Sequence, residues 1–413
     1  MKRFKTLFLA LTAFCLLLPT VLSAQMNWTC ATDSAEWSRR YGHTSVVFDN
    51  KMWVLGGTEF SSPYYINDVW YSTNGGDWIE ATDSAEWSKR DYPTSVVFDN
   101  KMWILGGGGT SFKNDVWYST NGADWICATD SAEWSQRHSH VSVVYDNKMW
   151  ILGGRELFSS KNDVWYSTNG VDWTCATDSA GWSKRDYYAA VVYDNKIWVL
   201  GGHGQGGVDK NDVWYSTNGA DWTQATAFAL WSARYGHTAV AFDNKMWILG
   251  GYYFTYRNDV WYSTNGADWM CGTASAEWSA REAHTSVVFD NKMWVLGGSD
   301  STGNHRNDVW YSSGLGTEEI ASLPLTMTEV LEICPNPTQS VIRVRGPFSG
   351  GKAIAIKIFD VSGKLIKEIA TPSSQIRNDG MVEISLQGIN SGVYFLKCEA
   401  DDYRATEKLI LSR

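Results

Sequence analysis

Beyond residue 22, the sequence has no apolar stretch that approaches the ~20 residues of a membrane-spanning helix. It also has no long acidic or basic block, although its formal net charge is −10. Tryptophan is absent after Trp310, whereas all 24 tryptophans lie between Trp28 and Trp310. These absences argue against a membrane-spanning helix, make nucleic acid and anionic membranes poor partners, and divide the chain into two compositional halves.

Residues 1–24 have the pattern of a secretory signal peptide. Three basic residues within the first five positions precede an apolar run from Leu7 to Leu22, and two small residues follow it. Cys15 lies inside this run behind Phe14, whereas a lipoprotein signal needs a small residue before the modified cysteine. We therefore expect this segment to direct export and to be removed, without leaving a lipid anchor.

One motif occurs six times in the tryptophan-rich part of the chain, at intervals of 47 to 50 residues. Paired glycines mark it at Gly56-Gly57, Gly106-Gly107, Gly153-Gly154, Gly201-Gly202, Gly250-Gly251 and Gly297-Gly298. A period near fifty residues is typical of propeller blades. The sequence therefore predicts an all-β fold, with a six-bladed β-propeller over residues 25–313.

Each copy has the pattern of four short strands joined by tight turns. In the first copy, the pairs Asp49-Asn50 and Asn74-Gly75 suit type I′ turns, because Gly, Asn and Asp tolerate the positive φ needed at both central positions. The segment from Met52 to Leu55 is apolar on both faces. Such a strand is expected where each blade packs between two neighbours.

Four tryptophans recur in each copy, and in the first they are Trp37, Trp53, Trp70 and Trp78. The sixth copy breaks off after Trp310 without its fourth tryptophan, and Trp28 near the N-terminus supplies the missing one. Because pairing the two ends of the array in one blade removes exposed sheet edges, we expect the N-terminal strand to complete the sixth blade.

The double glycine, the downstream sequence NDVWYS, the later tryptophan and the upstream arginine and histidine resemble the kelch repeat. The resemblance extends from residue 26 to about residue 313. It implies a kelch-type β-propeller and leaves the ligand open.

The last part of the chain has a different pattern. Residues 314–331 lose the repeat and are interpreted as a linker, and alternating segments over residues 332–413 predict a small β-sandwich. Pro335-Asn336-Pro337, the turn from Phe359 to Lys364 and the segment from Ile389 to Lys397 resemble the C-terminal sorting domain of the type IX secretion system. An ordinary accessory sandwich is the alternative.

The sorting-domain resemblance implies a route and two partners. The protein would pass through the periplasm and cross the outer membrane, with the type IX secretion machinery and its C-terminal signal peptidase as partners. The product would be secreted or attached to the outer-membrane surface.

Six cysteines follow the predicted signal segment. Four of them come two residues after a fourth-strand tryptophan, each in a different blade: Cys30, Cys127, Cys175 and Cys271. These positions are too far apart for a disulfide, which needs Cα atoms within about 7 Å, so we expect buried apolar side chains. Cys334 and Cys398 form a candidate disulfide pair in the second domain, and their state stays open.

The two ends of the strands differ in how much their sequences vary. The Asp-Asn and Asn-Gly turns barely change between copies, whereas the segments after the paired glycines and between the blades change almost everywhere. Because strand direction alternates, the turns share one face and the variable segments share the other. Loops on a rigid scaffold usually carry the binding residues, so we expect the variable face to bind a ligand.

The variable segments are rich in tyrosine and histidine, and we expect these side chains to be exposed. Tyrosine combines an apolar plane with a hydroxyl, which suits a glycan or a protein surface, and no cofactor is expected. Packing of the loops against one another is the alternative role. The candidate ligand-binding residues are Tyr41, His43, Tyr64, Tyr65, Tyr92, His138, His140, Arg155, Tyr187, Tyr188, His203, Tyr235, His237, Tyr252, Tyr253, Tyr256, His284 and His305.

An arginine begins every blade, as Arg40 and Arg90 do in the first two. Its full repetition favours a structural role, through backbone carbonyls or the repeated carboxylates, over a basic ring that faces an anionic ligand. Histidine recurs three residues later in four blades, but neighbouring inner strands stand too far apart for these rings to converge on a metal ion.

We therefore expect a non-catalytic surface protein that binds protein or glycan. The alternative is an extracellular polysaccharide hydrolase or lyase, because the turn from Tyr118 to Trp125 loosely resembles the Asp-box turn of sialidases. Glycosidases usually need two carboxylates about 5 to 10 Å apart, and the variable segments hold few acids, among them Asp186 and Glu282. A purely structural surface-layer or adhesion role is a third possibility.

Overall fold

The computed structural model describes residues 26–60, 64–312, 332–334, 341–345, 354–360, 364–371, 381–400 and 403–411. Contacts divide the chain into two compact units, of which one covers Ser23–Glu318 and the other contains Glu319–Arg413. The predicted signal peptide and linker lie outside the described residues. Within the described residues, no helix is long and apolar enough to cross a membrane.

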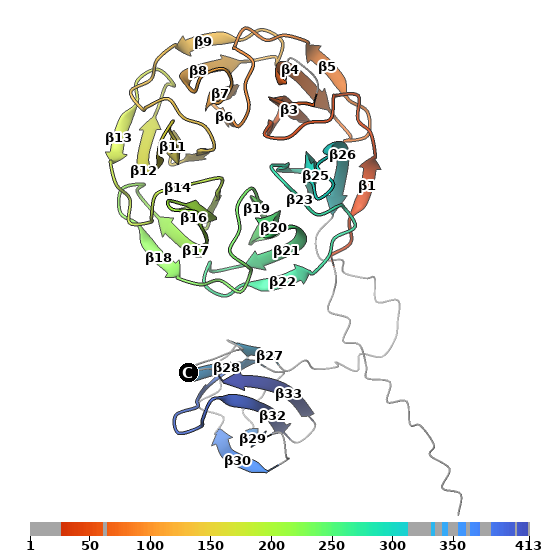
Figure 1. The fold of residues 1–413 in the computed structure, drawn as a ribbon, viewed down its shortest axis with the longest axis vertical. Helices are drawn as coiled ribbons and strands as arrows, with labels where there is room; N and C mark the ends of the chain where they lie inside the picture. The colour runs from red at the N-terminus through yellow and green to blue at the C-terminus, as the bar shows by residue number, and fades with distance from the viewer. Residues whose placement is uncertain are drawn as a thin grey trace, which may run out of the picture. The chain divides into compact units, whose positions relative to one another are not determined.

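Six four-stranded antiparallel blades form a ring (Figure 1). Blade 1 contains β2 (Thr44–Phe48), β3 (Lys51–Thr58), β4 (Tyr65–Ser72) and β5 (Ile79–Thr82). Blade 2 contains β6 (Thr94–Phe98), β7 (Lys101–Gly107), β8 (Lys113–Ser119) and β9 (Ile126–Thr129). Blade 3 contains β10 (Val141–Tyr145), β11 (Lys148–Arg155), β12 (Ser160–Ser167) and β13 (Thr174–Thr177).

The other three blades repeat this order. Blade 4 contains β15 (Ala189–Tyr193), β16 (Lys196–Gly204), β17 (Val208–Ser216) and β18 (Thr223–Thr226), and blade 5 contains β19 (Thr238–Phe242), β20 (Lys245–Tyr253), β21 (Thr255–Ser263) and β22 (Met270–Thr273). Blade 6 contains β24 (Thr285–Phe289), β25 (Lys292–Asp300), β26 (His305–Ser312) and β1 (Thr29–Thr32). Two-residue strands, β14 (Arg185–Asp186) and β23 (Arg281–Glu282), precede blades 4 and 6.

The N-terminal strand completes the sixth blade, as predicted. Strand β1 pairs antiparallel with β26, and Cys30 lies opposite Trp310 (Figure 1). Trp28 is buried, its ring meets that of Trp278 edge to face at 5.9 Å, and its backbone N–H donates to Glu277. The first and last segments of the propeller are therefore held in one sheet, which closes the ring.

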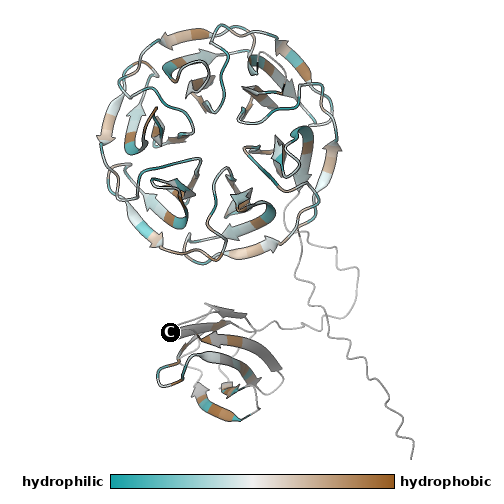
Figure 2. Ribbon diagram, viewed as in Figure 1, coloured by the Kyte–Doolittle hydropathy of each residue, from teal (hydrophilic) through white to brown (hydrophobic). Residues whose placement is uncertain are grey.

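Hydrophobic clusters fill the spaces between neighbouring blades. One cluster joins Phe48 and Leu55 of blade 1 to Met102 and Ile104 of blade 2. In β3, the side chains from Met52 to Leu55 are all at most 2% exposed, which confirms a strand that is apolar on both faces. Figure 2 shows apolar residues distributed along the strands of all six blades.

A buried arginine ties together the strands of each blade. Arg137 donates to both carboxylate oxygens of Asp163, at 2.7 and 2.8 Å, and to the carbonyl oxygen of Gly153. The same pattern recurs in all six blades, and every one of these arginines is 0% exposed. The predicted structural role is confirmed, and a basic ring at the surface is excluded.

The two kinds of turn differ from each other. Asp49 and Asn50 both have positive φ, at 48° and 54°, as the type I′ prediction requires. The prediction was wrong for Asn74-Gly75, because only the glycine has positive φ. In this loop, Ser72 Oγ accepts hydrogen bonds from the backbone N–H groups of Asn74 and Gly75. Asn74 Oδ1 accepts hydrogen bonds from the backbone N–H groups of Gly76 and Asp77. These side-chain bonds stabilise a longer loop between the third and fourth strands.

The repeated cysteines are exposed, so the prediction that they are buried was wrong. The corrected residues are Cys30, Cys127, Cys175 and Cys271, all free thiols. They lie on the outermost strand of each blade, which has a strand partner on only one side and exposes its second residue. Their spacing after the tryptophan therefore places them toward solvent.

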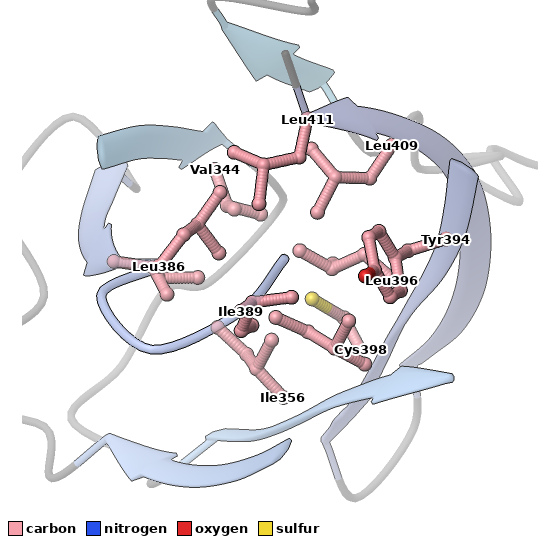
Figure 3. Close-up of a cluster of buried hydrophobic side chains, with 11 residues drawn as sticks. Val344, Ile356, Leu386, Ile389, Tyr394, Leu396, Cys398, Leu409 and Leu411 are labelled. Atoms are coloured by element: carbon pink, nitrogen blue, oxygen red, sulfur yellow. The ribbon is translucent and has the colours of Figure 1, made fainter. Parts of the chain in front are cut away.

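The second unit has two sheets. One contains β27 (Glu332–Cys334), β28 (Val341–Arg345) and β31 (Met381–Ser385), and the other contains β29 (Ile354–Asp360), β30 (Leu365–Thr371), β32 (Gly392–Ala400) and β33 (Tyr403–Leu411). Side chains from both sheets share one core (Figure 3). Cys398 lies in this core as a free thiol, and burial raises its pKa to about 12. The side chain of Cys334 lies outside the described residues.

Candidate functional site

A four-residue segment leads into the first strand of each blade and is here called an inner loop. The six inner loops are residues 40–43, 90–93, 137–140, 185–188, 234–237 and 281–284. The first residue of each is the buried arginine. The third residue has positive φ in every copy, between 45° and 61°. Each inner loop therefore bends sharply as it approaches the centre of the propeller.

The third residues of the inner loops form a closed ring of backbone hydrogen bonds. The ring runs through Gly42, Tyr92, Ser139, Tyr187, Gly236 and Ala283. Each of these residues donates its N–H to the carbonyl of the preceding member, with N···O distances of 2.6 to 3.4 Å. The ring fixes the inner loops of all six blades relative to one another. Tyr92 and Tyr187 hold a backbone conformation that is uncommon for bulky residues, which marks their side chains as functional candidates.

A cavity of about 280 Å³ lies beside this ring on the loop face. Its lining residues include Tyr92, Arg155, Tyr187, His203, Tyr235 and Glu282. These side chains come from blades 2 to 6, so one site is assembled from five copies of the repeat. The repeat supplies the frame, and the residues that differ between copies supply the surface of the cavity.

Tyrosine rings form a continuous aromatic wall at the cavity. The ring of Tyr187 lies 4.9 Å from that of Tyr92 and 6.1 Å from that of Tyr235. Tyr235 contacts Tyr252 at 5.4 Å, and Tyr252 contacts Tyr256 at 5.1 Å. The sequence predicted that these residues share a face, and the structure brings their rings into contact.

Two of the basic side chains in the cavity have a carboxylate partner. Arg155 Nη1 lies 3.8 Å from Asp186 Oδ2, and His203 Nδ1 lies 2.7 Å from Asp209 Oδ1. Burial raises the pKa of Glu282 to about 7. Within the described residues, no three His, Cys, Asp or Glu side chains converge in the manner of metal ligands.

Gly236 provides the space for the Glu282 carboxylate. A Cβ atom at this glycine would lie 3.0 Å from Glu282 Oε2, a tighter contact than most such atoms make. Gly236 also has positive φ, so it serves the ring and the cavity together.

Six candidates are buried, so the expectation that they are exposed was wrong for them. Five are at most 4% exposed, namely His43, His140, Tyr188, His237 and His284, and the sixth is His305, at 9%. His140 Nε2 lies 3.0 Å from Thr94 Oγ1 of the preceding blade, and the Tyr188 hydroxyl donates to the Leu152 carbonyl of blade 3. Burial lowers the pKa of His140 to about 3. In five inner loops, the histidine or tyrosine at the fourth position therefore connects neighbouring blades.

The remaining candidates are not among the residues that line the cavity. Tyr41 contacts Tyr92 at 5.9 Å and His305 at 4.4 Å. The ring of His138 contacts those of Tyr92, at 6.1 Å, and Phe112, at 4.4 Å. The others are Tyr64, which is 57% exposed, Tyr65, which pairs with Thr58, and Tyr253, which contacts Phe254.

Glu282 lines the cavity but was not among the predicted ligand-binding residues. It occupies the second position of its inner loop, where the six copies have Tyr41, Asp91, His138, Asp186, Tyr235 and Glu282. This variability, flanked by a repeated arginine and the ring residue, was a signal that could have found it.

Comparisons with known proteins agree with the two units. The family profile described as the KLHDC2/KLHL20/DRC7 Kelch-repeats domain matches residues 15–154, 126–270 and 187–330. The profile of the secretion system C-terminal sorting domain matches residues 332–412. No curated protein matches the chain.

A solved structure titled "Structure of YjhT" is similar in fold, with a TM-score of 0.57 and 15% sequence identity. The similarity covers 68% of this chain and 96% of that one. The C-terminal domain indicates type IX secretion to the cell surface or the extracellular space. The chain belongs to the kelch-repeat family of β-propellers and carries a secretion system C-terminal sorting domain.

Proposed function

We propose that the protein is a non-catalytic binding protein outside the cell, and that the loop-face cavity holds a sugar unit of a glycan. The observation that carries this proposal is the cavity of about 280 Å³ lined by Tyr92, Tyr187 and Tyr235. Its volume lies just below the usual range for small-molecule sites, roughly 300 to 1,000 Å³. A single sugar ring suits this space better than a folded protein surface does.

The chemistry of the lining also suits a sugar. Tyrosine rings offer apolar planes to the C–H groups of a pyranose and hydroxyls to its polar edge. Arg155, His203 and Glu282 add charged or polar groups that can bind sugar hydroxyls. The cavity therefore combines apolar planes with a few convergent polar groups, as binding sites for small molecules usually do.

The placement of the acids favours binding over hydrolysis. Retaining and inverting glycosidases usually work with two carboxyl groups that flank the scissile bond. Among the residues that line this cavity, Glu282 is the one carboxylic acid. Asp186 is 0% exposed and accepts a hydrogen bond from Ser160, so its carboxylate is not presented to a ligand.

A glycan array tests the proposal. We expect the purified full chain to be retained on a subset of glycans, and Tyr235→Ala to lower retention at least tenfold. Tyr64→Ala is the matched control, because this tyrosine is 57% exposed and is not among the cavity-lining residues. Absence of retention for the unchanged chain, or equal loss in both variants, would contradict the site. Release of reducing sugar from a polysaccharide panel would contradict its non-catalytic nature.

A further inference from the structure

Glu282 differs from the two basic residues in the cavity. Asp186 lies beside Arg155, and Asp209 is hydrogen-bonded to His203. For the carboxylate of Glu282, the described residues provide neither an ion pair nor a hydrogen bond. The cavity therefore has one acidic group whose charge no neighbouring side chain balances.

The surroundings of Glu282 are aromatic. Burial raises the pKa values of Tyr235 and Tyr256, and the negative charge of Glu282 is the next cause in both. Tyr41 and Tyr92 are affected by the same charge to a smaller extent. Among these tyrosines, Tyr92 and Tyr235 line the cavity together with Glu282, so the carboxylate shares the cavity with their rings.

Arg155 lines the same cavity but lies beside Asp186, and within the described residues no cationic side chain pairs with Glu282. The faces of aromatic rings attract cations, and such contacts are strongest where water is excluded. A carboxylate makes its strongest hydrogen bonds with charged donors such as an ammonium group. The tyrosine rings and the Glu282 carboxylate would therefore both bind a cation more strongly than a neutral hydroxyl.

We propose that the ligand is an amino sugar with a free ammonium group, and that Glu282 binds this group while the tyrosine rings cover the sugar. This inference rests on the proposed sugar-binding function. Burial of the unpaired carboxyl raises its pKa to about 7, as expected for an acid that lacks a cationic partner. An ammonium group would supply that partner and favour the ionised carboxylate.

Three monosaccharides of similar ring structure test the charge requirement. Glucosamine has a free ammonium group at C2, N-acetylglucosamine has a neutral amide there, and glucose has a hydroxyl. In calorimetric titrations of the full chain at pH 7, we expect glucosamine to bind at least tenfold more tightly than the two neutral sugars. Glu282→Gln should reduce glucosamine binding to the level of glucose and leave glucose binding nearly unchanged.

Glu59→Gln is the control variant, since Glu59 is not among the cavity-lining residues. It should bind all three sugars as the unchanged chain does, and thermal unfolding of each variant checks that the fold is kept. Equal affinity for glucose and glucosamine, or a preference for glucosamine that survives Glu282→Gln, overturns the ammonium proposal and leaves sugar binding standing. If none of these sugars binds and the glycan array is also blank, the proposed function itself fails.

Discussion

The turn face and the loop face of the propeller use the same repeat in opposite ways. On the turn face, the Asp-Asn turns have the same positive φ values in all six blades, and five blades share the hydrogen bonds of the Asn-Gly loop. On the loop face, the second residue of the inner loop is one of four residue types across the six copies. Packing therefore keeps the copies alike, whereas positions without a packing role are free to build a single site from several blades.

The largest effect should come from comparing two arginines of blade 3. Arg137 is 0% exposed and bonded to Asp163, whereas the side chain of Arg155 is 45% exposed at the cavity. Arg137→Met leaves a buried carboxylate without its partner and should lower the free energy of unfolding by about 3 to 5 kcal/mol. Arg155→Met should change it by less than about 1 kcal/mol while weakening ligand binding. Urea unfolding followed by tryptophan fluorescence measures the free energy of unfolding of both variants, and equal losses would contradict the roles assigned to the two arginines.

Two glycines with similar backbone conformations provide a second pair. Gly122 has a φ of 80°, and a Cβ there would lie 2.1 Å from the ring of Trp53 in the neighbouring blade. Gly206, on the loop face, has a φ of 84° and no heavy atom within 4 Å of such a Cβ. Gly206→Ala should cost about 1 to 2 kcal/mol through its positive φ alone. Gly122→Ala should cost about 1 to 3 kcal/mol more because of overpacking, and identical unfolding curves would count against the tight contact between blades.

Within the inner loops, the fourth position of blade 3 and the second position of blade 6 should respond in opposite directions to pH. Burial lowers the pKa of His140 from 6.5 to about 3, so this histidine is protonated at a higher pH in the unfolded chain than in the folded one. The free energy of unfolding therefore falls as the pH drops from about 6.5 to about 3. Burial raises the pKa of Glu282 from 4.5 to about 7, so stability falls as the pH rises from about 4.5 to about 7.

Substitutions separate these two dependences. His140→Tyr introduces the residue that blade 4 has at this position, Tyr188, and should remove up to about 1.4 kcal/mol of stability loss per pH unit on acidification. Glu282→Gln should remove the loss between about pH 4.5 and 7. Free energies of unfolding at pH 4, 5.5 and 8 measure both changes. A variant that keeps the full pH dependence of the unchanged chain would contradict the burial assigned to that residue.

The fold could be predicted because its rules are repeated. The paired glycines, the turns and the four tryptophans recur in the copies, so the strands assigned in one copy can be compared with those of the other five. The role of Trp28 in closing the ring was predicted because the sixth copy lacks its own fourth tryptophan. Repetition also marked the buried arginines such as Arg40 correctly, because a residue present in every blade has to satisfy the same packing in every blade.

The site could be predicted only in part, because a pattern does not say how deeply a side chain is buried. His140 and His138 stand two residues apart in one inner loop, yet one connects blades and the other contacts the aromatic wall. Their roles depend on the positive φ between them, at Ser139, which the sequence does not reveal. Cys30 was misplaced for a related reason, since spacing gave its strand but not which side of that strand faces solvent.

The smallest effect should come from a repeated contact that blade 5 lacks. A glutamate accepts the backbone N–H of a fourth-strand tryptophan at 2.9 to 3.0 Å in the pairs Glu36–Trp78, Glu86–Trp125, Glu133–Trp173 and Glu277–Trp28. Leu230 occupies the equivalent position in blade 5 and is 51% exposed. Leu230→Glu should restore the bond to Trp269 and raise stability by roughly 0.5 to 1.5 kcal/mol, seen as a higher melting temperature. Phe228→Ser is the control, because it returns a nearby residue to the repeated one without adding this bond, and an equal gain from both would show that removing exposed apolar surface is the cause.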